Sequence, residues 1–274
     1  MRTIYALLIA SCCSFTAFGQ QGAFSLGTFA GLSAYGGDLV EQDIEITEMN
    51  PALGIIGRYE LKSWLTLRGS LMAGTISGSD LNSGDINRRK RNLSFRSPIY
   101  ELSVMPEFNI YTFNLPSKQT LTPYAFIGAG VFYYNPKALY EGEWVQLQPL
   151  GTEGQGLPGY ESKYNLIDFS IPYGIGLKFA VSDKATIGLE FGTRYTFTDY
   201  LDDVSTVYPD NKILAATSGA LAAALSDRTS EYTGIPTQRA ENAGRGGAVY
   251  PDVYHFIGAT VTINLFTPEV VEKK

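Results

Sequence analysis

The chain has little of the chemistry that usually marks an enzyme or a disulfide-bonded secreted protein. Its two cysteines, Cys12 and Cys13, both lie in the first 20 residues, and its only histidine is His255. Residues after position 20 therefore have no thiol that could form a disulfide or a cysteine-ligated metal site. A chain of 274 residues must then be held by burial and backbone pairing alone.

Two further shortages narrow the class of protein. The 21 Lys and Arg residues are outnumbered by 27 Asp and Glu, which gives a formal net charge of −6 at pH 7. Nucleic acid is bound by basic surfaces, so we expect no nucleic-acid partner. After the N-terminus, no stretch approaches the roughly 18 uninterrupted apolar residues of a membrane-spanning helix.

Residues 1–19 have the pattern of a secretory signal peptide. Arg2 supplies a basic start, a short apolar core follows, and Ala17-Phe18-Gly19 is a small-x-small cleavage site. We expect cleavage before Gln20, which leaves one domain over residues 20–274. Ile9-Ala10-Ser11-Cys12 also fits a degenerate lipobox that would leave Cys12 acylated, but its apolar core would be very short.

The abundant feature of the chain is alternation with a period of two. In residues 166–179, every odd position from Ile167 to Phe179 is apolar, while the even positions are small or charged, as at Lys178. A strand sends successive side chains to opposite faces, so this segment has one fully apolar face. That face is longer than one face of an ordinary soluble strand and suits a strand that crosses a bilayer.

The same pattern recurs in eight segments, about 23–36, 52–61, 64–76, 97–111, 122–134, 166–179, 185–198 and 253–266. The connections alternate between short ones, at 62–63, 112–121 and 180–184, and long ones, at 37–51, 77–96, 135–165 and 199–252. Outer-membrane barrels have short periplasmic turns and longer outer loops. We therefore expect an all-β fold in the cell outer membrane: an eight-stranded antiparallel transmembrane β-barrel with four long outer loops. A soluble eight-stranded barrel also alternates, but its outer face would be polar.

The charges of the expected strands fall on the face opposite the apolar one. They form a balanced set of four cations and four carboxylates: Arg58, Glu60, Arg68, Glu101, Glu107, Lys178, Glu190 and Arg194. A charge on the lipid face at mid-bilayer depth costs about 2–4 kcal/mol, which explains its absence there. An eight-stranded barrel is only wide enough for side chains to fill it. The sequence thus predicts a paired, structural charge network that plugs the lumen, since buried charges must be paired.

Few residues are candidates for catalysis or metal binding. His255 and the nearby acids could form an Asp/His dyad at the rim, but a lone histidine at a membrane boundary is far more often structural. Asp199, Asp202 and Asp203 could offer oxygens to calcium. They lack the spacing of a dedicated calcium loop, so a loop-folding role is favoured over this weak metal candidate. We expect no catalytic residues, no cofactor and no enzymatic activity.

Two loop segments have a composition of their own. Arg88-Arg89-Lys90-Arg91 is a basic cluster that could contact anionic lipopolysaccharide or a protein, although a solvated loop tip is the more common outcome. Residues 213–225 are rich in Ala and Leu with apolar residues at helical spacing. That spacing predicts one short helix inside the last long loop.

Several stretches at the junctions of loops and strands resemble one known family. They are Tyr35-Gly-Gly-Asp-Leu39, Arg91-Asn-Leu-Ser-Phe95, Ile99-Tyr-Glu-Leu102, residues 122–137, residues 147–156 and Thr198-Asp-Tyr-Leu-Asp-Asp-Val204. Together they resemble a Bacteroidota outer-membrane barrel family whose best-known member is PorG of the type IX secretion system. The resemblance implies an outer-membrane barrel attached to the periplasmic PorK lipoprotein and PorN ring. The family is often present in several copies per genome, so membership does not assign this copy to secretion.

Three functions remain open at this point. The first is a non-enzymatic barrel that anchors or organises the type IX secretion assembly through its periplasmic ring. The second is a surface module whose long loops bind an extracellular ligand or lipid. The third, a small-solute channel, is disfavoured by the expected width of the barrel.

Overall fold

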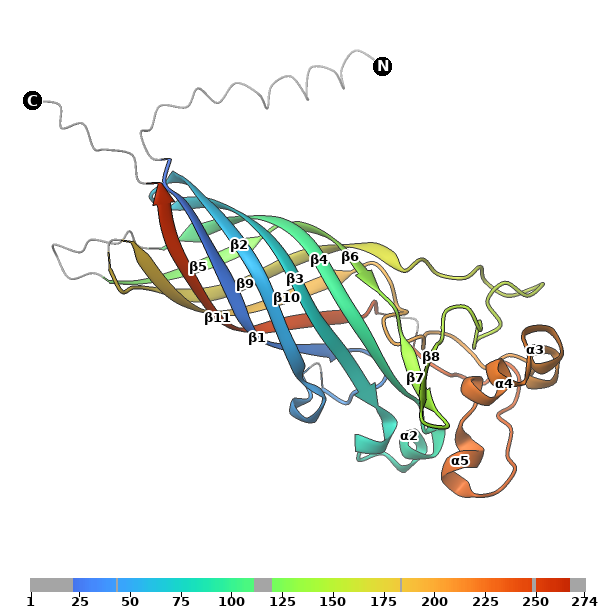
Figure 1. Cartoon of the computed structure of the whole chain (residues 1–274). Helices are drawn as coiled ribbons and strands as arrows, with labels where there is room; N and C mark the ends of the chain where they lie inside the picture. Colours follow the sequence, from blue (N-terminus) through green and yellow to red (C-terminus); the bar gives the residue numbers. More distant parts are fainter. Residues whose placement is uncertain (1–21, 43, 111–119, 183, 248–249, 267–274) are drawn as a thin grey trace, which may run out of the picture.

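The computed structural model describes residues 22–42, 44–110, 120–182, 184–247 and 250–266. Its main feature is one antiparallel sheet that is rolled into a closed ring (Figure 1). The strands of the ring are β1 (Phe24–Gly36), β2 (Asn50–Lys62), β3 (Leu65–Ser79), β4 (Ser94–Asn109), β5 (Leu121–Ile127), β6 (Ala129–Tyr134), β9 (Ile167–Ala180), β10 (Ala185–Thr196) and β11 (Val253–Phe266). Both the expected signal peptide and its cleavage site lie outside the described residues.

The ring closes because β1 pairs with both β2 and β11. Every other neighbour in the ring is also the next strand along the chain. β5 and β6 act as one strand between β4 and β9, interrupted at Gly128. A Cβ at Gly128 would lie 2.2 Å from the carbonyl oxygen of Val104, so only glycine fits at this interruption, and the register against β4 is the same on both sides of it.

The eight predicted strand segments are all present, and the all-β antiparallel barrel is confirmed. Their ends differ from the prediction by three residues at most, as at Ser79, where β3 extends beyond position 76. One addition was not predicted. A hairpin of β7 (Lys137–Tyr140) and β8 (Glu143–Gln146) lies inside the long connection 135–165 and joins the ring through one pair, Arg96 and Lys137.

The loops at the long-loop end contain short helices (Figure 1). They are η2 (Ile46–Glu48), η3 (Asp80–Asn82), α2 (Ile86–Arg91), α3 (Asn211–Ser218), α4 (Ala220–Ser226) and α5 (Thr229–Thr233). The prediction of one helix over 213–225 is wrong, because Gly219 at φ 97° breaks it into α3 and α4. None of the helices in the described residues is long and apolar enough to cross a membrane.

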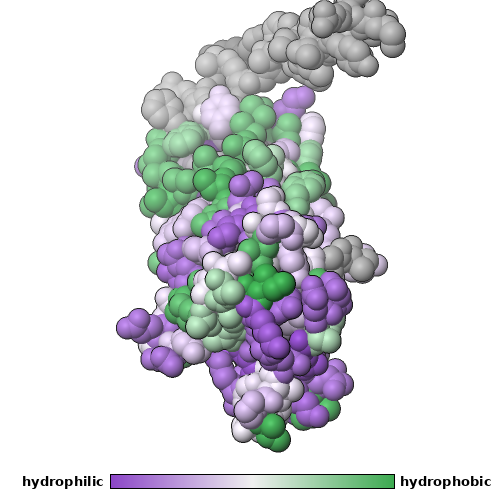
Figure 2. Space-filling view, turned by 90° about the vertical axis from the view of Figure 1, so that its right-hand side faces the viewer, coloured by the Kyte–Doolittle hydropathy of each residue, from purple (hydrophilic) through white to green (hydrophobic). Residues whose placement is uncertain are grey.

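The two faces of the barrel wall differ sharply in chemistry. The outward side chains are large and apolar, and many are more than half exposed, such as Phe169 at 67% and Leu189 at 60%. Inward neighbours such as Arg68 and Ile56 are fully buried. Figure 2 shows the hydrophobic side chains on the barrel wall and the more hydrophilic ones at the long-loop end. An apolar band around a closed sheet is the surface that a bilayer covers, and the chain is an outer-membrane β-barrel.

Candidate functional site

The lumen holds a cluster of buried charges centred on Glu107 of β4. Its carboxylate accepts hydrogen bonds from Arg58 Nε at 3.0 and 3.1 Å and from Lys178 Nζ at 2.6 Å. Arg68 Nη1 lies 3.4 Å from Glu107 Oε1 and 2.5 Å from Glu190 Oε2. Three strands thus supply cations to one carboxylate, because β2, β3 and β9 bring these residues to the same level of the lumen as β4.

A second pair lies farther toward the long-loop end. Arg194 Nε is 3.0 Å from Glu101 Oε2, and Tyr254 donates a hydrogen bond of 2.7 Å to the same oxygen. The guanidinium of Arg194 lies over the Phe256 ring at 4.5 Å. Large buried side chains surround this pair, including Phe132 and Tyr254, so the interior of the barrel is filled and not open.

One of the eight predicted lumen charges lies elsewhere. Glu60 is exposed near the end of β2, and among the described residues it forms no ion pair. Glu60 lies on the same face as Arg58 but two residues nearer the end of the strand, where its side chain is exposed to solvent and senses the charge of Lys178 without forming an ion pair. The buried set is therefore four cations and three carboxylates, and Arg58 Nη2, Arg68 Nε and Arg68 Nη2 have no hydrogen-bond partner among the described residues.

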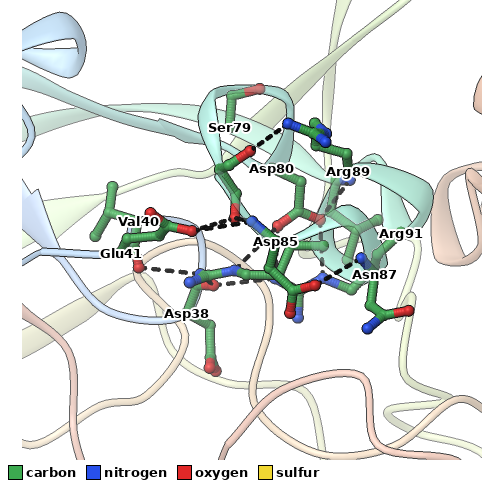
Figure 3. Close-up of polar contacts among 12 residues, drawn as sticks. Asp38, Val40, Glu41, Ser79, Asp80, Asp85, Asn87, Arg89 and Arg91 are labelled. Carbon is green, nitrogen blue, oxygen red and sulfur yellow. Dashed lines mark hydrogen bonds and ion pairs between the residues drawn. The ribbon is translucent and has the colours of Figure 1, made fainter.

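The four long loops pack on one another as a folded layer over the end of the barrel, here called the outer cap (residues 37–49, 80–93, 135–166 and 197–252). Figure 3 shows where the first two loops meet. Glu41 Oε1 accepts hydrogen bonds from Ser83 Oγ at 2.5 Å and Gly84 N at 2.9 Å. Arg91 reaches Asp80 through two bonds of 2.8 Å and donates to the Asp38 carbonyl at 3.0 Å. These contacts fix loops that are far apart in sequence.

The basic cluster of the second loop is therefore partly structural. Burial opposes the charge on Arg91, but the hydrogen bonds and the charge of Asp80 outweigh it and raise the Arg91 pKa. Arg88 donates to the carbonyls of Asp38 and Val40. Only Lys90 of this cluster is exposed. The contacts of Arg88 and Arg91 leave little of the cluster available to an external anion.

Arg245 joins the third and fourth loops at the centre of the cap. Its side chain is almost fully buried, with 2% exposed. It donates to Glu153 Oε1 at 3.1 Å, to the Asp203 carbonyl at 2.5 Å and to the Ser226 carbonyl at 3.1 Å. Glu153 also accepts bonds from two backbone N–H groups, one of them Ser205 N at 2.9 Å. Arg245 thus ties three loop segments to one point.

A tyrosine bridges two buried carboxyls where the cap meets the barrel. Tyr35 Oη lies 2.6 Å from Asp202 Oδ2 and 3.0 Å from Asp252 Oδ1. Burial, and then the charges of neighbouring aspartates, raises the pKa of both carboxyls well above its ordinary value. A hydroxyl can donate only one hydrogen bond, so the contact with the second carboxyl requires a proton on that carboxyl. The raised pKa values of Asp202 and Asp252 favour this protonated form.

The three aspartates of the calcium candidate point to different partners. Asp202 bonds Tyr35, whereas Asp203 accepts from Tyr164 Oη at 2.7 Å and from Thr152 Oγ1. Burial raises the pKa of Asp203 to about 6, although Arg245 lowers it. Burial also raises the pKa of Asp199 to about 7. The described residues contain no group of three or more ligand side chains that could hold a metal ion.

His255 lies on the outward face of β11, between the inward-facing Tyr254 and Phe256. It is 5% exposed, its Nδ1 is 3.0 Å from Thr193 Oγ1, and its ring stacks on Phe191 at 5.8 Å. Tyr254 separates it along the strand from Asp252, which bonds Tyr35 and the backbone N–H of Leu201. The structure thus places His255 in a packing role and gives it no shared site with the rim aspartates.

Four of the stretches that carry the family resemblance, at 35–39, 91–95, 147–156 and 198–204, meet in the cap. Tyr35 bonds Asp202, the Asp38 carbonyl accepts from Arg91, and Thr152 bonds Asp203. Sequence reasoning did not find Glu153, Arg245 and Asp252. No periodicity marks them, since the partners of Arg245 and Asp252 are between 19 and 217 residues away along the chain.

The structure can be compared with solved outer-membrane barrels. Neisserial surface protein A (NspA) is 10% identical and matches with a TM-score of 0.43, which covers 89% of this chain and 99% of that one. Ail, the attachment invasion locus protein of Yersinia pestis, in complex with the heparin analogue sucrose octasulfate, is 11% identical with a TM-score of 0.37, over 89% and 97%. The N-terminal β-barrel domain of Pseudomonas aeruginosa OprF gives 11% and 0.37, over 89% and 98%.

No curated protein matches the sequence of the chain. A family model does match, and it extends over residues 2–223, which include seven of the eight ring strands and the first two helices of the fourth loop, apart from the end of α4. This chain therefore belongs to the family described as a domain of unknown function, DUF6089.

Proposed function

We propose that the protein is a non-enzymatic outer-membrane anchor that serves the type IX secretion system by contacting its periplasmic PorK/PorN ring. The single observation that carries this role is the filled lumen. Buried pairs on Glu107 and Glu101 occupy the interior, which leaves a rigid post and no route for a substrate. The motif resemblance to the PorG family supplies the partner.

The short-turn end is the side on which a periplasmic partner would dock. Turns there are brief, as between β2 and β3, and carry cations such as Lys62 and Lys184. Lys62 lies over the ring of Trp64 at 5.5 Å, and Trp64 stacks on Phe108 at 6.4 Å. Aromatic girdles of this kind lie at the membrane boundary, so the turn projects just beyond the bilayer.

The test of the anchor is co-purification with the PorK lipoprotein. Charge reversal at the short-turn end (Lys62→Glu with Lys184→Glu) should reduce co-purification. The matched control reverses two charges at the opposite end, at the tip of the β7–β8 hairpin (Glu141→Lys with Glu143→Lys), and should leave it unchanged. Loss of the partner in the control alone would contradict the assigned docking end.

Deletion of the gene tests whether this copy serves secretion. Export of type IX cargo should fall in the deletion strain and return with the wild-type gene but not with the Lys62→Glu/Lys184→Glu variant. Normal export without the gene would assign this barrel to another role.

The second candidate, a surface module that binds an extracellular ligand, is favoured by one observation. The outer cap is a folded layer with its own ion pair between Arg245 and Glu153, and it is not a set of short connections. A binding assay with intact cells and with cells whose residues 211–240 are replaced by a short linker would detect it. Retention of secretion in that variant would separate the two functions.

The channel is tested by planar-bilayer conductance of the purified protein. A filled lumen should give no stable openings. Ion-selective openings in the wild-type barrel would overturn the plug and with it the anchor as the leading function.

A further inference from the structure

The lipid-facing wall of the barrel has a groove on one side. Directly opposed outward residues form a row across five strands: Leu53, Ala73, Tyr100, Tyr133 and Ile167. With the next row toward the short-turn end, they line a groove of about 600 Å³. Its lining is almost wholly apolar, because the inward residues of these strands carry the charges.

The small side chain of Ala73 forms the notch in this row. Its neighbours on either side are large and exposed, Leu53 at 63% and Tyr100 at 57%. Tyr100 stacks on Tyr133 with ring centroids 6.3 Å apart, which fixes one wall of the notch. A flexible apolar chain can lie in such a notch.

Two cations lie above the groove on the same outward face. Arg96 is four residues from Tyr100 on β4, about 13 Å along the strand. Lys137 of β7 is its directly opposed partner, so the two side chains share a face. The guanidinium of Arg96 lies over Trp144 of β8 at 5.8 Å, and Trp144 is 48% exposed. Tryptophan, arginine and lysine together are typical of the membrane–water interface.

The charges of Arg96 and Lys137 are not neutralised within the protein. Among the described residues, neither has a carboxylate within 4 Å. Ser77, the residue opposite Arg96 on β3, binds the carboxylate of Glu48 at 2.6 Å, and Asn82 Nδ2 binds the same carboxylate at 2.5 Å. Arg96 and Lys137 therefore present unpaired positive charge at the depth of lipid headgroups.

We propose that this groove binds one anionic lipid of the outer leaflet, whose phosphate lies between Arg96 and Lys137 and whose acyl chain fills the notch at Ala73. Arginine forms paired hydrogen bonds with phosphate oxygens, and lysine adds a point charge. The separation of about 13 Å along β4 suits a headgroup above and a chain below. Both halves of the site are needed, so neither free phosphate nor a neutral lipid satisfies it. This site is independent of the anchoring role.

The chain offers an internal reporter for this lipid. Trp144 and Trp64 are its two tryptophans, and Trp64 lies at the other end of the barrel. In a Trp64→Phe background, Trp144 fluorescence is measured in nanodiscs of phosphatidylcholine that contain a few per cent phosphatidylglycerol with brominated chains. The reference is the same mixture with the bromine on the phosphatidylcholine. Each interfacial cation contributes roughly a fivefold preference, so the pair should give up to about 30-fold for the anionic lipid.

Matched variants separate the two halves of the site. Arg96→Gln with Lys137→Gln should bring the preference close to one. Ala73→Phe should fill the notch and reduce quenching without a change of charge, whereas Lys62→Gln at the opposite end should leave the preference as in the wild type. Glycerol 3-phosphate in excess should not compete, since it lacks the acyl chain.

Several results would overturn the lipid site. Equal quenching by both brominated lipids would do so, as would a preference that persists in the Arg96→Gln/Lys137→Gln variant. Competition by glycerol 3-phosphate alone would reduce the site to a phosphate contact. A dimer seated on this face in neutral nanodiscs, seen by native mass spectrometry, would replace the lipid with a second copy. Heat-modifiability of every variant confirms that each one is folded.

Discussion

Glu107 is the residue whose loss should affect the barrel most. In the Glu107→Gln variant, the amide keeps the shape of the side chain but removes the charge that Arg58, Arg68 and Lys178 share. The buried set changes from four cations and three carboxylates to four and two, so its net charge rises from +1 to +2. Breaking a buried ion pair costs about 3–5 kcal/mol.

The remaining contacts decide where in that range the variant falls. Arg68 keeps Glu190 at 2.5 Å and Lys178 keeps Asn109 Oδ1 at 3.0 Å, but Arg58 loses the only carboxylate within reach among the described residues. We expect a loss of about 4–5 kcal/mol in the free energy of unfolding. Glu101→Gln, which strands only Arg194, should cost less, about 3 kcal/mol.

Urea unfolding in lipid vesicles, followed by tryptophan fluorescence and by heat-modifiability, measures both variants. The double variant Glu107→Gln/Lys178→Met removes one of the three cations that Glu107 pairs with and should recover about 2 kcal/mol, a coupling of the size seen between groups in contact. A Glu107→Gln barrel within about 0.5 kcal/mol of the wild type would refute the reasoning. Such tolerance would mean that water in the lumen solvates the cations and that the interior is not a dry plug.

Three further perturbations test the wall and the cap. Leu189→Arg places a charge on the lipid face, so it should cost about 2–4 kcal/mol and impair assembly, as seen in a heat-modifiability gel. Thr196→Ser keeps the hydroxyl that donates to the Asp252 carbonyl at 2.6 Å and should be near neutral. Equal tolerance of both variants would mean that the inward and outward faces are wrongly assigned. Arg245→Ala leaves Glu153 buried without its cation and should speed proteolysis within 199–252 while the barrel stays folded. Arg228→Ala is the control, because its partner Glu231 is 40% exposed. Equal proteolysis rates in the two variants would show that Arg245 does not hold the cap together. Asp199 has a pKa raised from 3.8 to about 7 because of burial and then the charges of Asp38 and Glu153, so the folded cap binds its proton more tightly than the unfolded chain does. Cap stability should therefore fall as pH rises from about 4 to about 7 and then level off. Asp203, whose pKa is raised to about 6, contributes a loss of stability in the same direction up to that pH. Amide exchange of residues 199–210, compared with that of strand residues, measures the effect, and an unchanged pH dependence in Asp199→Asn would exclude Asp199 as its source.

The sequence by itself determined the barrel wall. A strand has only two faces, and a charge on the lipid face is too costly. The apolar odd positions from Ile167 to Phe179 therefore mark an outward face, and the charges of Glu190 and Arg194 mark an inward face. Loop lengths then set the parity of the connections. The wall is predictable because its rule is local and repeats along every strand.

The tertiary structure decided what no period describes. The stagger between strands, the shear of the barrel, places three cations beside Glu107 and leaves Glu60 outside the cluster. Gly219 divides the expected helix in two. Arg245 binds Glu153, which is 92 residues away and belongs to another loop. The groove at Ala73 also exists only because five strands align their outward residues in one row. Such contacts depend on register and loop packing between distant segments, whereas the alternation that predicted the wall is contained within each strand.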